Sequence, residues 1–391
     1  MDFELSEEQV LLRDTVSRFL SDSAPFDKRQ AIIDAHPGYA PEHWKTLAEL
    51  GVMALPFTEK TGGLGGGAVD TMLVMEQMGR ALLTGPYVAT ILLAGKLLEQ
   101  AGNGGGILEN VINGRRKLAF AYAERAAGFD IAGTALRAVR DVEDYRLDGE
   151  KCAVFHGDTA NDLVVLARTF GNEGDTAGLS LFLIPGDIAG IHKTPYQTQD
   201  GNRAADISFE GVVVPAANLV GEEGGAHCVV EGVLDNAAAA LVAEATGIMW
   251  AVYEMTLDYM KTRTQFGATL GSFQALQHRM VDIYMMCEMA QSMSYEAAAA
   301  CDSGDPARRR QAVSAAKSLV GRYGRKVGQE GIQLHGGIGM TLEFPVGHYF
   351  KRLCMIDASL GDVTWHEARY ARWEGTKPEA LSTTLSNSSP A

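Results

Sequence analysis

The hydrophobic positions in the first third of the chain recur with the period of an α-helix. Ser6-Glu-Glu-Gln9 has the form of a capping box, and apolar residues follow it at helical spacing over 10–20. The helical pattern resumes over 70–83 and 90–100, after the glycine-rich loop 62–67. We therefore predict a helical unit at the start of the chain.

Short apolar runs of strand character replace the helical period after position 117. The predicted strands cover 118–123, 144–155, 162–168, 179–184, 191–197 and 204–214. Asp148-Gly149 and Asp200-Gly201 are typical of hairpin turns, the first inside a predicted strand and the second between two of them. The middle block therefore predicts a β-domain of ordinary size.

The helical pattern returns after position 221. We predict helices over 226–263, 273–303, 306–334 and 357–373, the first of them apolar almost all round. The tail after Lys377 is rich in Ser, Thr and Pro and is expected to fray. The predicted fold class is α+β, with an N-terminal α-helical domain (1–117), a middle β-domain of barrel or sandwich type (118–223) and a C-terminal helical bundle with a frayed tail (224–391).

The formal net charge of −15 narrows the range of partners. An acidic protein suits neither nucleic acid nor an anionic membrane, although a few local arginines can still hold the phosphates of a small ligand. The five cysteines are scattered without a CxxC pair, which favours a reducing cytoplasm and neither a metal site nor a disulfide framework. The start does not resemble a signal peptide, and no apolar run is suited to span a bilayer. We expect a cytoplasmic protein.

Three stretches are candidates for chemistry. Arg263-Thr-Gln-Phe-Gly267 ends the long predicted helix, where an arginine is commonly a surface residue that compensates the helix dipole. Gln333-Leu-His-Gly-Gly-Ile-Gly339 has glycines that let a backbone approach a ligand, or that simply end a helix at Gly336. Ala123-Glu-Arg-Ala-Ala-Gly-Phe-Asp130 lies between two strands and is, by composition, only a loop.

Taken together and in order, these segments resemble the acyl-CoA dehydrogenases, the flavin-dependent family that desaturates acyl-CoA thioesters between Cα and Cβ. The resemblance covers nearly the whole chain. It rests on Phe3-Glu-Leu-Ser-Glu-Glu-Gln9, Gly51-Val-Met-Ala-Leu-Pro56, Gly62-Gly-Leu-Gly65, Val213-Val-Pro-Ala-Ala-Asn-Leu-Val-Gly221, Arg263-x-x-Phe-Gly267, Phe273-Gln274 and Gln333-x-x-Gly-Gly337. It implies an N-terminal helical domain, a middle β-domain and a C-terminal four-helix bundle, usually arranged as a tetramer.

The family shares one flavin adenine dinucleotide (FAD) between two subunits, so the resemblance implies a cofactor site across an interface. One subunit's β-domain holds the isoalloxazine ring, and the neighbouring subunit's bundle holds the pyrophosphate and adenosine. The resemblance assigns the second role to Arg263, Phe266, Gln274, Gln333, Gly336 and Gly337. A guanidinium suits a diphosphate because it makes paired, charge-assisted contacts.

The ring-binding half departs from the family pattern. Where relatives read Thr-Glu-Pro-x-x-Gly-Ser-Asp, Ala123 replaces the hydroxyl that bonds the flavin edge, Arg125 replaces the proline, and Phe129 replaces a small serine near the CoA entry. Where relatives read Trp-Ile-Thr-Asn, Ala153 replaces the shielding indole and Phe155 replaces the hydroxyl that donates to flavin N5. We therefore expect several ring contacts to be absent.

The positions of the catalytic base also differ from the family pattern. Desaturation needs a carboxylate near the substrate α-carbon while hydride leaves Cβ for flavin N5. The two family positions for this glutamate are Gly361 and Ala237 here, so the resemblance implies no catalytic residue on this chain. Asp362 is a fallback, but successive residues point in different directions, and its simpler role is to cap the next helix. Asp235 stands where relatives often have a ligand-contacting aspartate, although bonding within the bundle explains it equally well.

An intact adenosine half beside an altered ring half predicts a subunit that completes the FAD site of a related catalytic chain in an α2β2 tetramer. The pattern is similar to the heteromeric acyl-CoA dehydrogenases of bacterial steroid degradation and to pimeloyl-CoA dehydrogenase small subunits. It implies an acyl-CoA substrate with room for a bulky acyl group, and an electron-transfer flavoprotein as acceptor. The alternatives are a self-sufficient homotetramer with a non-standard base, a non-redox binding or structural protein on the same fold, and another flavin oxidase or monooxygenase.

Overall fold

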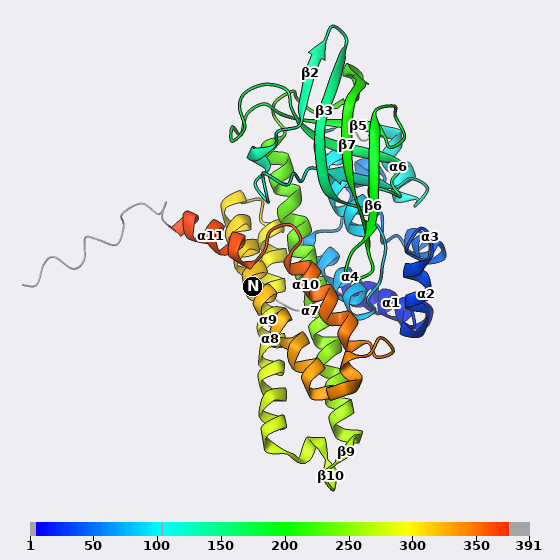
Figure 1. Cartoon of the computed structure of the whole chain (residues 1–391), viewed down its shortest axis with the longest axis vertical. Helices are drawn as coiled ribbons and strands as arrows, with labels where there is room; N and C mark the ends of the chain where they lie inside the picture. The colour runs from blue at the N-terminus through cyan, green and yellow to red at the C-terminus, as the bar shows by residue number, and fades with distance from the viewer. Residues whose placement is uncertain (1–4, 103–104, 375–391) are drawn as a thin grey trace, which may run out of the picture.

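The computed structural model describes residues 5–102 and 105–374, so the predicted fraying after Lys377 lies outside the described residues. A β-rich unit occupies one end of the molecule and a long helical bundle the other (Figure 1). The N-terminal helices pack against the side of the bundle near its junction with the β-rich unit. This is the α+β layout that the sequence predicted, and the junction is where the three parts meet.

The N-terminal part is helical, as predicted. Its elements are α1 (Glu7–Ser23), α2 (Phe26–Asp34), α3 (Pro41–Glu49), α4 (Ala68–Arg80), the π-helix η2 (Val88–Gly95), α5 (Lys96–Gln100) and α6 (Gly105–Ile112). The predicted capping box is present, because the backbone N–H of Gln9 donates to Ser6 Oγ and the backbone N–H of Ser6 donates to Gln9 Oε1. The local sequence thus determines where α1 begins.

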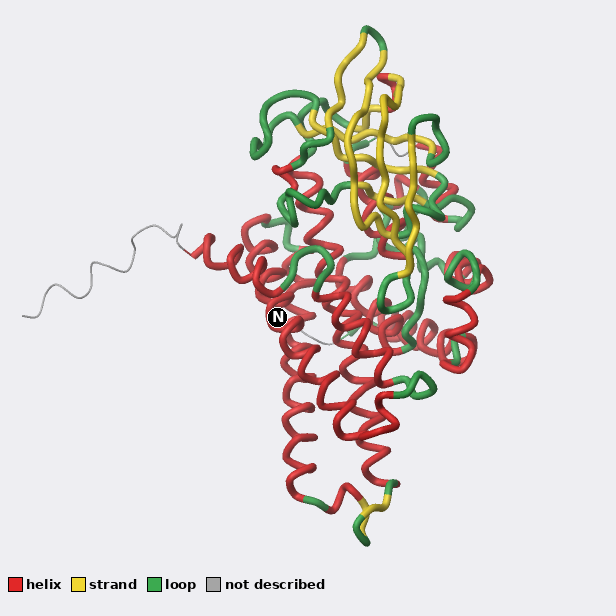
Figure 2. The backbone as a smooth tube through the Cα atoms, viewed as in Figure 1, coloured by secondary structure: helices red, strands yellow, loops and turns green. Residues whose placement is uncertain are grey.

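The β-rich unit is one eight-stranded sheet, drawn in yellow in Figure 2. Its strands are β1 (Leu118–Ala121), β2 (Arg137–Asp141), β3 (Asp144–Phe155), β4 (Asp162–Arg168), β5 (Leu179–Pro185), β6 (Ile191–Gln197), β7 (Arg203–Pro215) and β8 (Leu219–Val220). The strand order is β6-β7-β3-β2-β4-β5-β8, and β1 lies parallel to β4 off this path. The strand β2 was not predicted.

The prediction of a hairpin turn at Asp148-Gly149 is wrong. Strand β3 runs through both residues, and the pairing of β3 with β7 shifts register there. Gly149 has φ +142°, and a Cβ on it would lie 2.9 Å from Leu136 Cα, so glycine serves a bulge and a close approach and does not form a turn. The second signal is confirmed, since Asp200-Gly201 lies in the turn between β6 and β7.

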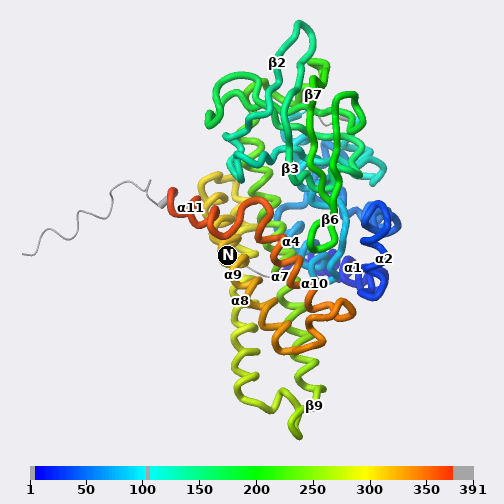
Figure 3. The backbone as a smooth tube through the Cα atoms, in the orientation of Figure 1, coloured from blue at the N-terminus to red at the C-terminus, as the bar shows by residue number. Residues whose placement is uncertain are grey.

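The bundle consists of α7 (His227–Thr262), α8 (Gln274–Asp302), α9 (Pro306–His335) and α10 (Val346–Asp357), and Figure 3 traces the chain up and down it. A small hairpin, β9 (Thr264–Gln265) with β10 (Ala268–Thr269), joins α7 to α8 at the end remote from the sheet. The predicted helix over 357–373 is wrong at its start. Helix α10 ends at Asp357, Gly361 adopts φ +101° in the linker, and α11 (Val363–Glu374) begins afterwards.

Two glycines bring α4 and α7 into backbone contact. A Cβ on Gly79 would lie 2.1 Å from the carbonyl oxygen of Glu244, and a Cβ on Gly247 would lie 2.1 Å from that of Glu76. The apolar surface of α7 is buried around most of its circumference, as the sequence pattern predicted. Even so, none of the described helices is long and apolar enough to cross a membrane.

Candidate functional site

The predicted diphosphate and adenosine residues gather at the end of the bundle remote from the sheet. Arg263 follows the last residue of α7, Phe266 lies in the turn between β9 and β10, Gln274 begins α8, and Gln333 lies in the last turn of α9. The two segments meet through Tyr259, one turn before Arg263, whose ring centroid lies 4.6 Å from that of His335. Arg263, Phe266, Gln274, Gln333, Gly336 and Gly337 are all exposed.

The polar groups at this end are free to meet a ligand. The guanidinium of Arg263 makes no hydrogen bond or ion pair with any residue that the structure describes, and the same holds for the amides of Gln274 and Gln333. No heavy atom lies within 4 Å of a Cβ built on Gly336 or Gly337. The N–H of Gly336 is bonded to carbonyls of α9, so Gly336 also ends the helix. A diphosphate fits this set of donors.

The residues at the positions that the resemblance assigns to the flavin ring lie where the bundle meets the sheet. Ala123 accepts a hydrogen bond from the N–H of Cys152, which brings it beside Ala153. Ala153 is exposed and adopts φ +51°. Phe129 packs edge-on against Trp365 of α11, with ring centroids 6.1 Å apart. The alanines offer no side-chain donor, and Phe129 fills space where relatives have a small serine.

Phe155 and His156 line a pocket of only about 50 Å³ at this junction. A water molecule occupies about 30 Å³ in the liquid, so one or two waters would fill it. His156 is buried, and its Nδ1 has no hydrogen-bond partner among the described residues. Burial lowers the pKa of His156 to about 4, so the ring is neutral at physiological pH. The residues present here do not fit an isoalloxazine ring.

Neither family position for the base has room for a glutamate. Gly361 is buried with φ +101°, and a Cβ on it would lie 2.6 Å from both His366 Nε2 and Trp365 Cε3. Ala237 is buried completely. His366 does not replace the missing carboxylate as a base, because burial, together with the charges of Lys317 and Arg369, lowers its pKa to about 3.

The two acidic candidates have structural roles in the bundle. Asp362 caps α11, since its Oδ1 accepts the N–H of Trp365 at 2.8 Å. Asp235 is buried, and its carboxylate accepts from Arg309 Nε at 3.1 Å and from Arg369 Nη1 at 2.6 Å. Both oxygens of Asp235 are therefore paired with arginines, whereas Asp362 has one oxygen engaged in the cap.

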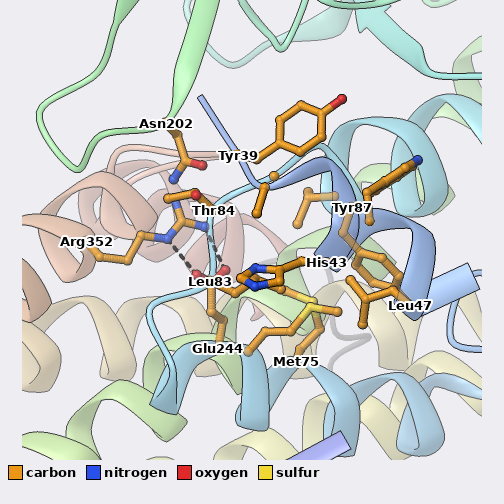
Figure 4. Close-up of a pocket in the computed structure, with 15 residues that line it drawn as sticks. Tyr39, His43, Leu47, Met75, Leu83, Thr84, Tyr87, Asn202, Glu244 and Arg352 are labelled. Atoms are coloured by element: carbon orange, nitrogen blue, oxygen red, sulfur yellow. Dashed lines mark hydrogen bonds and ion pairs between the residues drawn. The ribbon is translucent and has the colours of Figure 1, made fainter. Parts of the chain in front are cut away.

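Sequence reasoning missed a buried ion-pair network at the same junction. Arg352 of α10 donates to both oxygens of Glu244 at 2.6 Å and to Asp200 Oδ2 at 2.8 Å. Figure 4 shows the Arg352–Glu244 pair in the wall of a pocket formed with the N-terminal helices. Burial opposes the charge, yet the two carboxylates raise the pKa of Arg352. The available signal was Glu244 itself, a lone acid within the apolar run of α7.

The comparisons with known proteins cover all three parts of the chain. Family models match the acyl-CoA dehydrogenase N-terminal domain at 6–104, the middle domain at 119–212 and the C-terminal domain at 223–361. "Probable acyl-CoA dehydrogenase YngJ" of Bacillus subtilis is 32% identical over 370 residues, covering 92% of this chain and 96% of that protein. This chain belongs to the acyl-CoA dehydrogenase family.

Solved acyl-CoA dehydrogenase structures share the fold. Butyryl-CoA dehydrogenase from Megasphaera elsdenii superposes with a TM-score of 0.86 at 25% identity, over 95% of this chain and 99% of that one. A variant of the Tcur3481-Tcur3483 steroid ACAD superposes with a TM-score of 0.85 at 27% identity, over 94% of this chain and 98% of that one. The family carries out FAD-dependent dehydrogenation of acyl-CoA. The described residues contain no cluster suited to a metal ion.

Proposed function

We propose that this chain is the non-catalytic subunit of a heteromeric acyl-CoA dehydrogenase and completes the FAD site of a catalytic partner. The observation that carries the proposal is the contrast between Arg263, whose guanidinium has no partner among the described residues, and Gly361, where neighbouring rings leave no space for the base. One half of a family active site keeps its binding groups and the other half lacks its catalytic ones.

The placement of the two halves supports a shared cofactor. Phe155 lines a pocket together with Leu241, near the middle of α7, whereas Arg263 follows the last residue of that helix, beside the β9–β10 hairpin at the remote end (Figure 1). The helix between Leu241 and Arg263 spans about 33 Å, so we infer that a single FAD does not contact both places within one chain. Each FAD would therefore have its diphosphate on one chain and its ring on another. With a ring-binding partner, this chain would supply the diphosphate end, and no FAD ring would lie against Phe155.

The division of labour follows from the chemistry. Bound FAD would accept the hydride from the substrate Cβ, while a carboxylate of the partner takes the α-proton. Arg263 would hold the diphosphate through charge-assisted hydrogen bonds, with Gln274 and Gln333 on its remaining polar edges. Phe129 against Trp365 leaves a pocket of only about 90 Å³ on this chain's own substrate side, so we place acyl-CoA on the partner.

The partner in this proposal is a homologous chain in an α2β2 tetramer. The Tcur3481-Tcur3483 steroid ACAD joins two names in one enzyme, and we extend that pairing and a bulky acyl group to this chain. The exposed apolar residues at the bundle end need cover in an assembly of this kind. They are Phe266, Ile338, Met340 and Leu342. We further propose a cytoplasmic enzyme with an electron-transfer flavoprotein as acceptor.

The test is a flavin count on the chain purified alone and on the chain co-expressed with an acyl-CoA dehydrogenase from the neighbouring reading frame. We expect little flavin absorbance for the chain alone and bound flavin for the complex, with bleaching of the flavin by acyl-CoA in the complex only. One flavin per chain in a homomer that bleaches with acyl-CoA would establish the self-sufficient alternative. No flavin in either sample would favour the non-redox alternative.

A further inference from the structure

A second pocket, of about 270 Å³, lies on a different face of α7 from the pocket that Phe155 and His156 line at the junction. Its walls come from the loop before α4, from η2 and α5, and from α7, α8 and the start of α9. The positions on α7 differ from those of the junction, because Asn236 and Ala240 face this pocket whereas Leu241 lines the other. A space of this size, open to solvent on one side, has room for a small organic molecule.

The hydrogen-bond donors of this pocket that lack a partner among the described residues belong mainly to a cationic side chain, Arg309. Arg309 has a side chain only 16% exposed, and its Nε donates to Asp235 at 3.1 Å. Its two terminal nitrogens make no hydrogen bond within the part of the chain that the structure describes. Lys96 also lines the pocket, but its ammonium is paired with Glu99 and donates to the carbonyl of Pro56 at 2.7 Å, so only one of its three N–H groups remains.

The acid in the wall does not occupy these donors. Asp302 uses one oxygen on the N–H of Ala68 at 2.8 Å and the other on the N–H of Val69 at 3.3 Å, so its carboxylate caps α4. The remaining polar lining is neutral, namely Gln100, Asn236 and Thr71, and half of the apolar lining is alanine. Asp302 keeps its negative charge, but both of its oxygens are engaged at the start of α4, so it does not take up the N–H groups of Arg309.

We propose that this pocket binds a small organic carboxylate. The carboxylate accepts from the terminal nitrogens of Arg309, in the paired geometry that guanidinium and carboxylate favour. The hydrocarbon part lies on the small side chains of Ala239, Ala240 and Ala298, all buried in the pocket wall. The amide of Gln100, which has no partner among the described residues, is available to the ligand's second edge.

The ligand would act on the far side of α7 through Asp235. Arg309 and Arg369 share this carboxylate, and the Arg369 guanidinium lies 5.3 Å from the ring centroid of Trp365. Trp365 in turn packs against Phe129 at the substrate side. A carboxylate on the terminal nitrogens of Arg309 would share the guanidinium charge with Asp235, which stays on Nε. The charge left on Asp235 is then available to Arg369, so occupancy of the pocket and the position of Trp365 are linked.

The test uses propionate and its neutral analogue propionamide on the full chain, with binding followed by titration calorimetry. We expect saturable binding of propionate only. Arg309→Gln should weaken it at least tenfold, and Ala240→Leu should abolish it by filling the pocket. Arg308→Gln is the matched control, because Arg308 is adjacent, is 39% exposed, pairs with Glu296 and does not line the pocket. The affinity of Arg308→Gln for propionate should be unchanged.

Three results would overturn the carboxylate site. They are the absence of saturable propionate binding, equal binding of propionamide or inorganic phosphate, and unchanged affinity in folded Arg309→Gln and Ala240→Leu. The coupling has its own readout, because propionate should change the intrinsic fluorescence of the chain but not that of Trp365→Phe. An equal change in both proteins would refute the link through Trp365.

Discussion

The remote end of the bundle and its junction with the sheet differ in the burial and pairing of their polar side chains. At the remote end, Arg263 has no partner among the described residues and Phe266 is 92% exposed. At the junction with the sheet, the buried Glu244 is paired with Arg352, whose side chain is only 16% exposed, and Gly361 is enclosed by rings. The remote end is an exposed surface with polar groups unpaired within the described part of the chain, available to a ligand or a neighbouring chain. The junction is a packed interior in which the charged groups are paired. Under the proposed function, the chain offers a binding surface for the shared FAD while ordinary core residues occupy the positions of a base.

The largest loss of stability should come from removing the charge of Arg352 at the junction. Arg352→Leu leaves Glu244 and Asp200 buried without their shared cation, and removing one partner of a buried pair costs about 3–5 kcal/mol. Urea denaturation should show this loss in the free energy of unfolding. Arg13→Ala, which removes only a surface pair with Asp14, should cost about 1 kcal/mol or less. Equal losses in the two variants would contradict the contrast between interior and surface.

The second effect is a loss of stability at acidic pH, caused by the buried histidines His156 and His366 at the junction. Burial lowers the pKa of His366 to about 3 and that of His156 to about 4, from an ordinary value of 6.5. As the pH falls below 6.5, the unfolded chain binds these protons and the folded chain does not, so stability decreases. Each histidine contributes up to about 1.4 kcal/mol per pH unit over that window.

Thermal melts between pH 7 and pH 4.5 measure this dependence. His366→Gln keeps a polar side chain beside Leu360 and Ser314 but removes the titrating ring. The variant should therefore lose less stability than the parent as the medium is acidified. A slope identical to that of the parent would show that His366 is protonated equally in both states.

The third effect concerns the open end and should appear in ligand affinity and not in folding. Arg263→Ala removes a charge-assisted contact to the FAD diphosphate, which lowers the flavin affinity of the assembled enzyme by about 1.5–3 kcal/mol. The unfolding of the chain alone should hardly change, because Arg263 has no partner among the described residues. Lys261→Ala, at an exposed neighbouring position, is the control. Unchanged flavin occupancy at high dilution would remove Arg263 from the site.

The smallest effect should come from Asp362. Asp362→Asn keeps an N-cap acceptor for Trp365, and Asn and Asp cap helices about equally well. Turnover of acyl-CoA by the assembled enzyme, measured with an external electron acceptor, should change by no more than a few-fold. A loss on the order of a hundredfold, with flavin content intact, would identify Asp362 as the base and end the two-subunit proposal.

The sequence predicted long elements well and short-range breaks poorly. The helix predicted over 226–263 became α7 with ends within one residue, because a long apolar run has one interpretation. The helix predicted over 357–373 failed because Gly361, read only as a missing glutamate, also breaks the backbone with φ +101°. Asp148-Gly149 misled because a bulge and a turn both select glycine at positive φ.

The site was predictable where it depends on motifs and not where it depends on pairing. Arg263 and Gln333 were selected from short patterns, and the structure brings their segments together at one end, although their role toward FAD stays a prediction. The Arg352–Glu244–Asp200 network joins residues more than a hundred positions apart, so no local pattern connects them. Likewise, only the fold reveals that Arg309 and Arg369 share Asp235.

The packing around Gly361 also constrains the evolution of this chain. A glycine codon can become a glutamate codon by one base change, so the missing base is close at hand genetically. The side chain would nevertheless have to displace His366 and Trp365 and adopt a backbone conformation that suits glycine. A glutamate at position 361 would therefore need accompanying substitutions at the residues that surround it.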